Sequence, residues 1–146
     1  GAADVDVEDT GGVGGTLAGN ALSLAAARAT LDEVLDDSAW ERTEPLATRF
    51  AAGVEGALRR HGAGWHVVQL GCRAEYRFSP QPPRNGGEAA ELADAELERY
   101  LHLYALNRGV LVTPFHNMAL ISPATRPDQV DRHTEAFEGA LGELFA

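Results

Sequence analysis

The sequence predicts an α+β fold, in which helices cover one face of an antiparallel sheet of about four strands. Residues 65–78 contain two strand-like runs joined by a tight turn, and residues 110–122 contain two more. Apolar residues recur at helical spacing before, between and after these runs. A chain of 146 residues is long enough to build one domain of this kind with a real core.

The first helix is predicted over residues 21–34 or 21–35, directly after a glycine-rich loop that runs from Gly14 to Gly19. Asn20 is a good N-cap for this helix. The apolar positions of the helix are mostly small, namely Leu22, Ala25, Ala26, Ala29 and Leu31. A helix with so much alanine on one face can approach a neighbour closely, so we expect it to pack against another domain.

The glycine-rich loop and the helix start after it have the architecture of an anion site. The unpaired N–H groups of a helix N-terminus and the positive end of the helix dipole favour a phosphate. Glycines let the backbone approach the anion closely, and Thr16 adds one hydroxyl. The pattern alone leaves two interpretations open, a phosphate cradle and an ordinary capped helix.

A second helix is predicted to begin at Ser38, where Glu41 completes a capping box. Pro45 lies inside the pattern and is expected to kink the helix. Its apolar stripe consists of Leu46, Phe50, Val54, Ala57 and Leu58. The helix is expected to end at residues 61–64, which contain two glycines.

Two strands are predicted next, over residues 65–70 and 73–78, with Gly71-Cys72 as the tight turn of an antiparallel hairpin. The first strand is apolar and β-branched, so we expect it to be mostly buried. The second alternates, with Ala74, Tyr76 and Phe78 on one face and Arg73, Glu75 and Arg77 on the other.

The second half of the chain adds three helical segments and two strands. Residues 79–87 form a loop rich in proline and glycine, residues 88–93 a short helical turn, and a longer helix runs from Asp94 as N-cap to a stop at Gly109. The third and fourth strands are Val110–Pro114 and Met118–Ser122. A last helix is capped at or near Asp128, and its stripe contains Val130, Thr134, Phe137, Leu141, Leu144 and Phe145.

The glycine-rich segment resembles the one found in class-III, pyridoxal-phosphate-dependent aminotransferases. Gly15-Thr16-Leu17-Ala18-Gly19-Asn20-Ala21-Leu22, followed by Ala25-Ala26-Ala27 and Thr30-Leu31, is similar to the family's "GGTLSGNPLAM.AG..TL". The nearest branch is the one that contains glutamate-1-semialdehyde aminomutase. One departure is Ala21, where the family usually has proline; its loss affects helix initiation and not chemistry.

The resemblance extends from Gly14 to the last helix. Leu70–Phe78 has the layout of the family's "G.MF.L.F" strand, with more charge. Gly109–Pro114 resembles the start of the family's "GV.L.PS.FE..F.S..HT..DID.T" run. The residues in register with the rest of that run are Ser122, Ala124, Thr125, Asp128, Val130 and Asp131.

The resemblance implies that the chain is the C-terminal small domain of a fold-type I enzyme that uses pyridoxal 5'-phosphate. Residues 1–20 would be a lead-in and phosphate-binding loop from the end of the large domain, and residues 21–146 the C-terminal α+β domain with its linking helix. Gly15 and Thr16 would be the cofactor-binding residues, because the family's threonine contacts the cofactor phosphate of the neighbouring subunit. A homodimer is therefore implied for the longer protein.

The chain contains no lysine, since all 12 basic residues are arginines. An enzyme of this family needs a lysine amine to hold its cofactor covalently. No catalytic residue is therefore assigned within this chain. We expect the chain to be inactive alone and the catalytic lysine to lie upstream of Gly1.

Two departures bear on the substrate. Many class-III aminotransferases hold the substrate carboxylate with an arginine on the last strand, in an "R..P" pattern. Met118–Pro123 contains none, and the nearest, Arg126, follows the strand. The chain also lacks the acidic residue that aminomutases often carry after Phe115, which argues against strict aminomutase activity. The resemblance therefore implies amino transfer between a small-molecule donor and a carbonyl acceptor of unidentified structure.

Composition excludes several other functions. A net charge of −10 without any basic run argues against nucleic acid and anionic membranes as partners. The single cysteine, Cys72, excludes a disulfide framework and fits a reducing cytoplasm. No two of the five histidines have a ligand spacing of four residues, so no metal site is predicted. His116, in a turn between strands, is the histidine that the resemblance places nearest the substrate side, although a surface role is the simpler interpretation.

Two alternatives to the enzyme interpretation remain at this stage. Helix-covered antiparallel sheets also serve as stand-alone ligand-binding or regulatory modules. A purely structural interaction domain is the other alternative, and it predicts that Thr16→Ala leaves cofactor retention by the longer protein unchanged.

Overall fold

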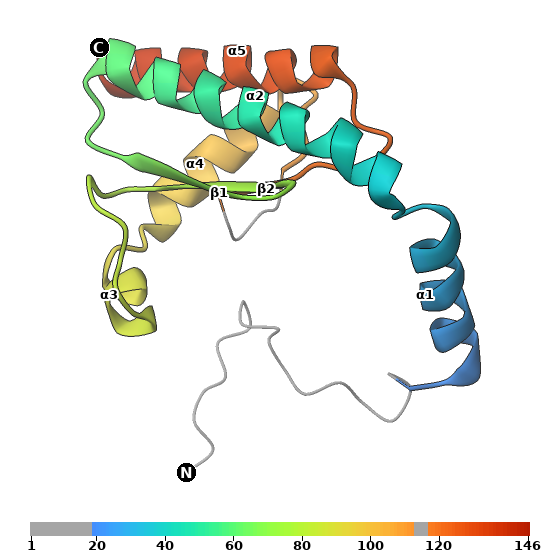
Figure 1. The fold of residues 1–146 in the computed structure, drawn as a ribbon. Coiled ribbons are helices and arrows are strands. Elements are labelled where there is room, and N and C mark those ends of the chain that lie inside the picture. The colour runs from blue at the N-terminus through green and yellow to red at the C-terminus, as the bar shows by residue number, and fades with distance from the viewer. Residues whose placement is uncertain (1–18, 113–116) are drawn as a thin grey trace. The chain divides into compact units, whose positions relative to one another are not determined.

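The computed structural model describes residues 19–112 and 117–146. The chain divides into two units, Gly1–Asp36 and Asp37–Ala146, which are described separately. The described part of the first unit contains α1 (Ala21–Glu33). The second unit contains α2 (Asp37–His61), β1 (His66–Leu70), β2 (Arg73–Arg77), α3 (Gly86–Glu91), α4 (Ala95–Leu106), β3 (Met118–Leu120) and α5 (Pro127–Leu144) (Figure 1).

Helix α1 begins as the sequence predicts. The Asn20 side chain accepts a hydrogen bond from the Ser23 amide at 3.0 Å, and its backbone is extended, as an N-cap requires. None of the α1 side chains is buried, and Leu22 and Leu31 are 80% and 63% exposed. Taken by itself, α1 therefore carries exposed apolar side chains.

The sheet has the strand order β1-β2-β3, and both pairs are antiparallel. The predicted hairpin is confirmed, with Leu70 opposite Arg73 and His66 opposite Arg77. Leu120 of β3 lies opposite Arg73 on the other side. The fold is α+β, as predicted, but the described residues contain three strands instead of about four.

The missing strand is the one predicted over Val110–Pro114. Residues 110–112 are described and belong to no strand, while residues 113–116 lie outside the described part. The amide of Val110 donates to the Ala105 carbonyl at 3.0 Å, so it is part of the end of α4 and not of a sheet ladder. Gly109, with φ of +77°, makes the turn that allows this bond.

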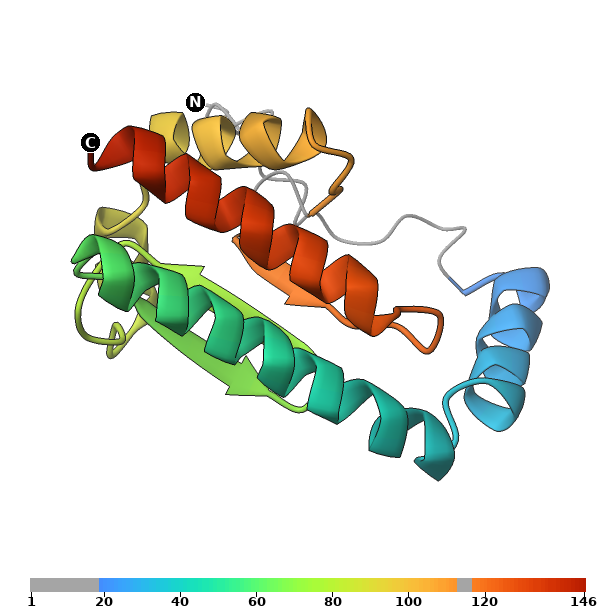
Figure 2. The same ribbon diagram turned by 90° about the horizontal axis from the view of Figure 1, so that it is seen from above.

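Helices α2 and α5 lie side by side over one face of the sheet (Figures 1 and 2). The core between the layers joins Ala74 and Tyr76 of β2 to the predicted stripes of both helices. Its helical members include Phe50, Val54, Leu58, Val130, Phe137 and Leu141. The alternation of β2 is therefore confirmed, because Ala74 and Tyr76 are buried, whereas Arg73, Glu75 and Arg77 are not.

Two details differ from the expectations. Strand β1 is not mostly buried, since Val68 and Leu70 are 47% and 78% exposed; no layer covers that face of the hairpin in the described residues. Helix α5 begins at Pro127, with Arg126 at the N-cap position, so Asp128 lies in the first turn. Helix α2 contains Pro45 without ending there, and the kink expected at this residue stays a prediction.

Two glycines let the helices approach closely. A Cβ at Gly53 of α2 would overlap the Oγ1 of Thr134 on α5 and lie 3.0 Å from its Cγ2. A Cβ at Gly139 of α5 would lie 2.8 Å from the hydroxyl of Tyr104 on α4. The layer of three helices thus depends on positions where no side chain fits.

Gly53→Ala is expected to destabilise the chain by about 1–3 kcal/mol, because overpacking at Thr134 outweighs the higher helix propensity of alanine. Urea unfolding of the 146-residue chain measures this. Gly56→Ala, three residues along α2, is the matched control, because its Cβ would meet the flexible ends of Arg60 and Arg59. That substitution should be neutral or stabilise by up to about 1 kcal/mol. Equal effects at the two positions would contradict the steric explanation.

Candidate functional site

The predicted cofactor-binding residues, Gly15 and Thr16, lie outside the described residues, as does His116. The described structure begins three residues after Thr16, at Gly19, and includes the helix start that would complete an anion site. By helix geometry the amides of Ala21 and Leu22 have no acceptor within α1. The first turn of α1 carries no acidic residue. The local electrostatics at this helix start are therefore compatible with a phosphate.

The two tyrosines of α4 have structural partners. Tyr100 donates its hydroxyl to the Ala140 carbonyl at 3.1 Å. Tyr104 donates to the Glu143 carboxylate at 3.0 Å, and the Arg108 guanidinium lies 3.4 Å from the centre of its ring. Burial, together with Glu143, raises the pKa of Tyr104 above its ordinary value. Both tyrosines hold α4 against α5, and neither is placed as a proton donor for catalysis.

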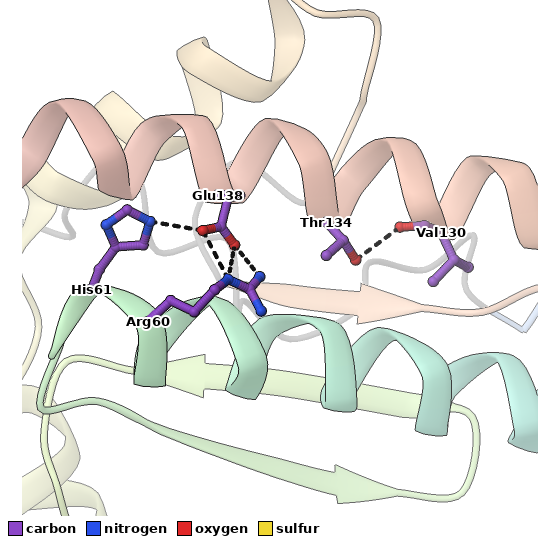
Figure 3. Close-up of polar contacts among 5 residues, drawn as sticks. All are labelled: Arg60, His61, Val130, Thr134 and Glu138. Carbon is purple, nitrogen blue, oxygen red and sulfur yellow. Dashed lines mark hydrogen bonds and ion pairs between the residues drawn. The ribbon is translucent and has the colours of Figure 1, made fainter.

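Polar side chains of α2 and α5 pair along the line where the two helices meet. Figure 3 shows Glu138 of α5 between Arg60 and His61 of α2, whose side chains both point to its carboxylate. The Arg60 Nε lies 3.0 Å from both oxygens of Glu138, and the His61 Nε2 donates to Oε1 at 2.8 Å. Hydrogen bonding from Arg60 is the main reason that the pKa of Glu138 lies below its ordinary value. A carboxylate held this way is a structural anchor and a poor general base.

The same junction carries a second pair. Arg49 of α2 binds Asp131 of α5 through two hydrogen bonds of 2.7 and 2.8 Å. Thr134, between the two pairs, donates its hydroxyl to the Val130 carbonyl of its own helix at 3.2 Å (Figure 3). These exposed pairs fix the alignment of the helices and contribute little energy each.

Arg126 is already paired with Asp128. It is the arginine nearest to the strand on which many class-III aminotransferases carry their carboxylate-binding residue. Its Nε and Nη2 both donate to the Asp128 carboxylate at 2.9 Å. The Nε–Nη2 edge of this guanidinium group is therefore occupied by Asp128. The structure agrees with the sequence that β3 supplies no arginine for this task.

A hollow of about 910 Å³ lies beside β3 and the first turns of α5. Its lining includes Arg126, Arg132 and Asp128 together with residues 109–112. Residues 113–116, which join two of its walls, lie outside the described part, so the hollow defines no site. Within residues 19–112 and 117–146, no group of three or more His, Cys, Asp or Glu side chains could hold a metal ion. None of the helices in these ranges combines the length and apolarity needed to cross a bilayer.

Sequence analysis noted Arg73, Glu75 and Arg77 only as the polar side of a strand. The structure brings all three together. The two arginines bind the carboxylate of Glu75 from either side, each at 2.7 Å. The alternating charges of Arg73-Ala74-Glu75-Tyr76-Arg77 were the signal for this cluster, because residues two apart on a strand share a face.

Comparison with known proteins points to one group. No family model matches the chain. The chain is 34% identical over 131 residues to glutamate-1-semialdehyde 2,1-aminomutase of Thermomicrobium roseum. The matched residues make up 89% of this chain and 30% of the relative. The enzyme of the same name from Desulforudis audaxviator is 33% identical over 133 residues, covering 90% and 31%. The chain thus spans about three tenths of the length of these curated relatives.

Solved structures agree. A glutamate-1-semialdehyde aminomutase from Pseudomonas aeruginosa PAO1, in complex with PMP, superposes with a TM-score of 0.83 at 52% identity, covering 91% of this chain and 29% of that one. An omega-transaminase from Sphaerobacter thermophilus shares the fold, with a TM-score of 0.69 at 22% identity over 92% of this chain and 32% of that one. Both comparisons match about nine tenths of this chain to about three tenths of a longer chain.

Proposed function

We propose that this chain is one domain of an enzyme that transfers amino groups between an amino donor and a carbonyl compound. The chain is a homologue of the C-terminal part of class-III pyridoxal-phosphate-dependent aminotransferases, in their glutamate-1-semialdehyde aminomutase-like branch. The observation that carries the proposal is the 52% identity to an aminomutase structure across 91% of the chain. That structure holds PMP, the amine form of the cofactor.

The residues of this chain indicate which part of the enzyme's chemistry this domain would supply. Pyridoxal phosphate, when bound, supplies the electron sink that lets an amino group leave one carbon skeleton and join another. Residues 1–20 would close the preceding cofactor domain, and residues 21–146 would form the C-terminal domain with its linking helix. Without a lysine, this chain contributes phosphate binding and no covalent link.

The backbone amides of Gly15 and Thr16 and the Thr16 hydroxyl would bind the cofactor phosphate. Support comes from the resemblance of the loop and from α1, whose capped start lacks acidic residues. In the family this contact crosses to the neighbouring subunit, so the proposal includes a homodimer. It also includes a cytoplasmic setting, for which the single cysteine is the support. Substrates are a small-molecule amino donor and acceptor.

The first experiment uses the longer protein that contains this chain. Its visible spectrum is recorded, the protein is reduced with borohydride, and the modified residue is mapped by mass spectrometry. A yellow protein with one pyridoxyl-lysine upstream of Gly1 supports the proposal. A colourless protein that takes up no cofactor contradicts it and favours a stand-alone ligand-binding or regulatory module.

Thr16→Ala in the longer protein is expected to weaken binding of pyridoxal phosphate roughly 10- to 100-fold, the value of one hydrogen bond to a charged group. Cofactor titration followed by absorbance measures this. Thr30→Ala is the control, because the Thr30 hydroxyl donates to the Ala26 carbonyl of its own helix and the substitution should leave the affinity unchanged. If Thr16→Ala binds the cofactor as tightly as the parent does, the loop is a helix cap and not a phosphate site.

A further inference from the structure

One asparagine of this chain is followed by glycine. It is Asn85, which precedes Gly86, whereas the other asparagines, Asn20, Asn107 and Asn117, precede alanine, arginine and methionine. Glycine has no Cβ, and its backbone moves more freely than that of any other residue. Only after Asn85, therefore, can the next backbone nitrogen approach an asparagine side chain without hindrance from a side chain of its own.

The surroundings of Asn85-Gly86 leave room for this approach. Both residues are exposed, and a Cβ built at Gly86 would meet nothing within 4 Å. The Gly86 amide is the first of α3, so helix geometry gives it no acceptor within the helix. No hydrogen bond of the helix therefore holds the Gly86 nitrogen in place.

Helix α3 resists opening only weakly. It has six residues, and none of its side chains is buried. Helices this short are marginal in water unless tertiary packing stabilises them. The ion pair between Arg84 and Glu88 lies across the helix start, and pairs of this exposed kind contribute little. The backbone at Asn85-Gly86 can therefore rotate at a small cost in free energy.

One hydrogen bond keeps the Asn85 side chain in its capping position. Its Oδ1 accepts from the Glu88 amide at 3.0 Å. A single hydrogen bond between neutral groups contributes little net stability, because water replaces it when it breaks. The cap therefore slows any reaction of the Asn85 amide group without preventing it.

The nearest carboxylate is not placed to act as a base. Glu88 accepts hydrogen bonds from the Arg84 amide at 2.8 Å and from the Arg84 Nη2 at 2.6 Å. Hydrogen bonding from the Arg84 side chain is the main reason that the pKa of Glu88 lies below its ordinary value. A proton on the Gly86 nitrogen is therefore lost to hydroxide from the solvent and not to this side chain.

We propose that Asn85 is a site of spontaneous deamidation. The Gly86 nitrogen, after losing its proton to hydroxide, attacks Cγ of Asn85 and closes a succinimide ring. The Cγ–Nδ2 bond breaks, and ammonia leaves with a proton taken from water. Water then opens the ring at either carbonyl, which gives aspartate or isoaspartate. The reaction needs no oxidant, cofactor or second protein, so the inference is independent of the proposed function.

The two products differ in their effect on α3. Aspartate keeps a side-chain oxygen for the Glu88 amide and adds a negative charge at the positive end of the helix, so the cap survives. Isoaspartate inserts a methylene group into the main chain. The hydrogen bond from the Ala89 amide to the Asn85 carbonyl, 3.1 Å in the intact chain, is then lost from its register.

Peptide mapping by mass spectrometry tests the proposal. The longer protein that contains this chain is incubated at mildly alkaline pH in water enriched in heavy oxygen, which marks conversion during the incubation. Asn85 should convert at least about tenfold faster than Asn20 and Asn107, because only Asn85 precedes glycine. Asn20 is the matched internal control, since its Oδ1 caps α1 through the Ser23 amide at 3.0 Å, as that of Asn85 caps α3.

A second sample is unfolded in guanidinium chloride. The native rate at Asn85 should lie within about tenfold of the unfolded rate, because α3 opens readily. A native protein that keeps Asn85 intact while the unfolded protein converts it would overturn the proposal, since the structure would then protect this position. Equal rates at Asn85, Asn20 and Asn107 would also overturn it.

Gly86→Ala tests the succinimide step. The added methyl group hinders the attacking nitrogen, so conversion of Asn85 should slow at least about tenfold. The variant should fold, because its Cβ meets nothing and alanine favours a helix. Gly64→Ala is the control, an exposed glycine that also has open space for a Cβ, and it should leave the rate unchanged. An unchanged rate in Gly86→Ala, or aspartate without any isoaspartate in the parent, would mean direct hydrolysis of the side chain and would refute the proposal.

Discussion

Leu141→Ala is expected to cost the 146-residue chain about 2–5 kcal/mol of unfolding free energy, the largest loss expected of the substitutions considered. Leu141 is 0% exposed and lies in the core formed by α2, α5 and the sheet. Removing its side chain loses apolar burial and leaves a cavity in a region where the backbone is already closely packed.

Urea unfolding followed by circular dichroism measures this loss. Leu144→Ala is the matched control in the same helix, because Leu144 is 42% exposed and should cost less than about 1 kcal/mol. Comparable losses from the two substitutions would mean that the 146-residue chain does not form this core by itself.

Acidification from pH 6.5 to pH 5 is expected to lower the stability of the chain by about 2 kcal/mol through His133 alone. His133 is 5% exposed, and its ring lies 4.3 Å from that of Phe50 and 5.9 Å from that of Phe137, measured between centroids. Burial lowers the pKa of His133 from 6.5 to about 4. Its Nδ1 has no hydrogen-bond partner among the described residues.

The sign follows from proton binding. Below pH 6.5 the unfolded chain protonates this histidine, whereas the folded chain does not until about pH 4. The unfolded state therefore binds the extra proton, and stability falls as the pH falls through this window. The loss reaches about 3 kcal/mol near pH 4.

His133→Phe should remove this dependence while keeping the ring contacts. Urea unfolding at pH 7, 6 and 5 compares the two chains. Glu88, Asp128 and Glu138, whose pKa values are lowered by arginine partners, add their own acid sensitivity only toward lower pH. An unchanged slope in the variant between pH 6.5 and 5 would rule out His133 as its source.

The helices and the hairpin could be predicted from the sequence because their signals are local. Asn20 and Asp94 cap helices where they were expected to, and Gly71-Cys72 joins two strands. The alternation of β2 also identified its buried face. Helical stripes that contain Phe50, Val54, Phe137 and Leu141 form the core, because a 3.6-residue period puts them on one side.

The third predicted strand failed at its first residue for a local reason. Val110–Val112 is as apolar and β-branched as a strand should be, yet the Val110 amide bonds to the Ala105 carbonyl at the end of α4. Exposure of β1 could not be predicted either, since a run of apolar residues does not reveal whether a second layer exists to cover it. The role of Gly53 is likewise visible only when Thr134 is seen beside it.

The sequence by itself determined the fold class, the relationship to aminotransferases and the absence of a lysine, because these depend on residue identity and short-range pattern. Tertiary structure decided which charges meet. It placed Arg60 and His61 of α2 on Glu138 of α5, and it placed Arg49 of α2 on Asp131 of α5. Ion pairs between elements depend on how the elements pack, and no periodicity along the chain encodes that distance.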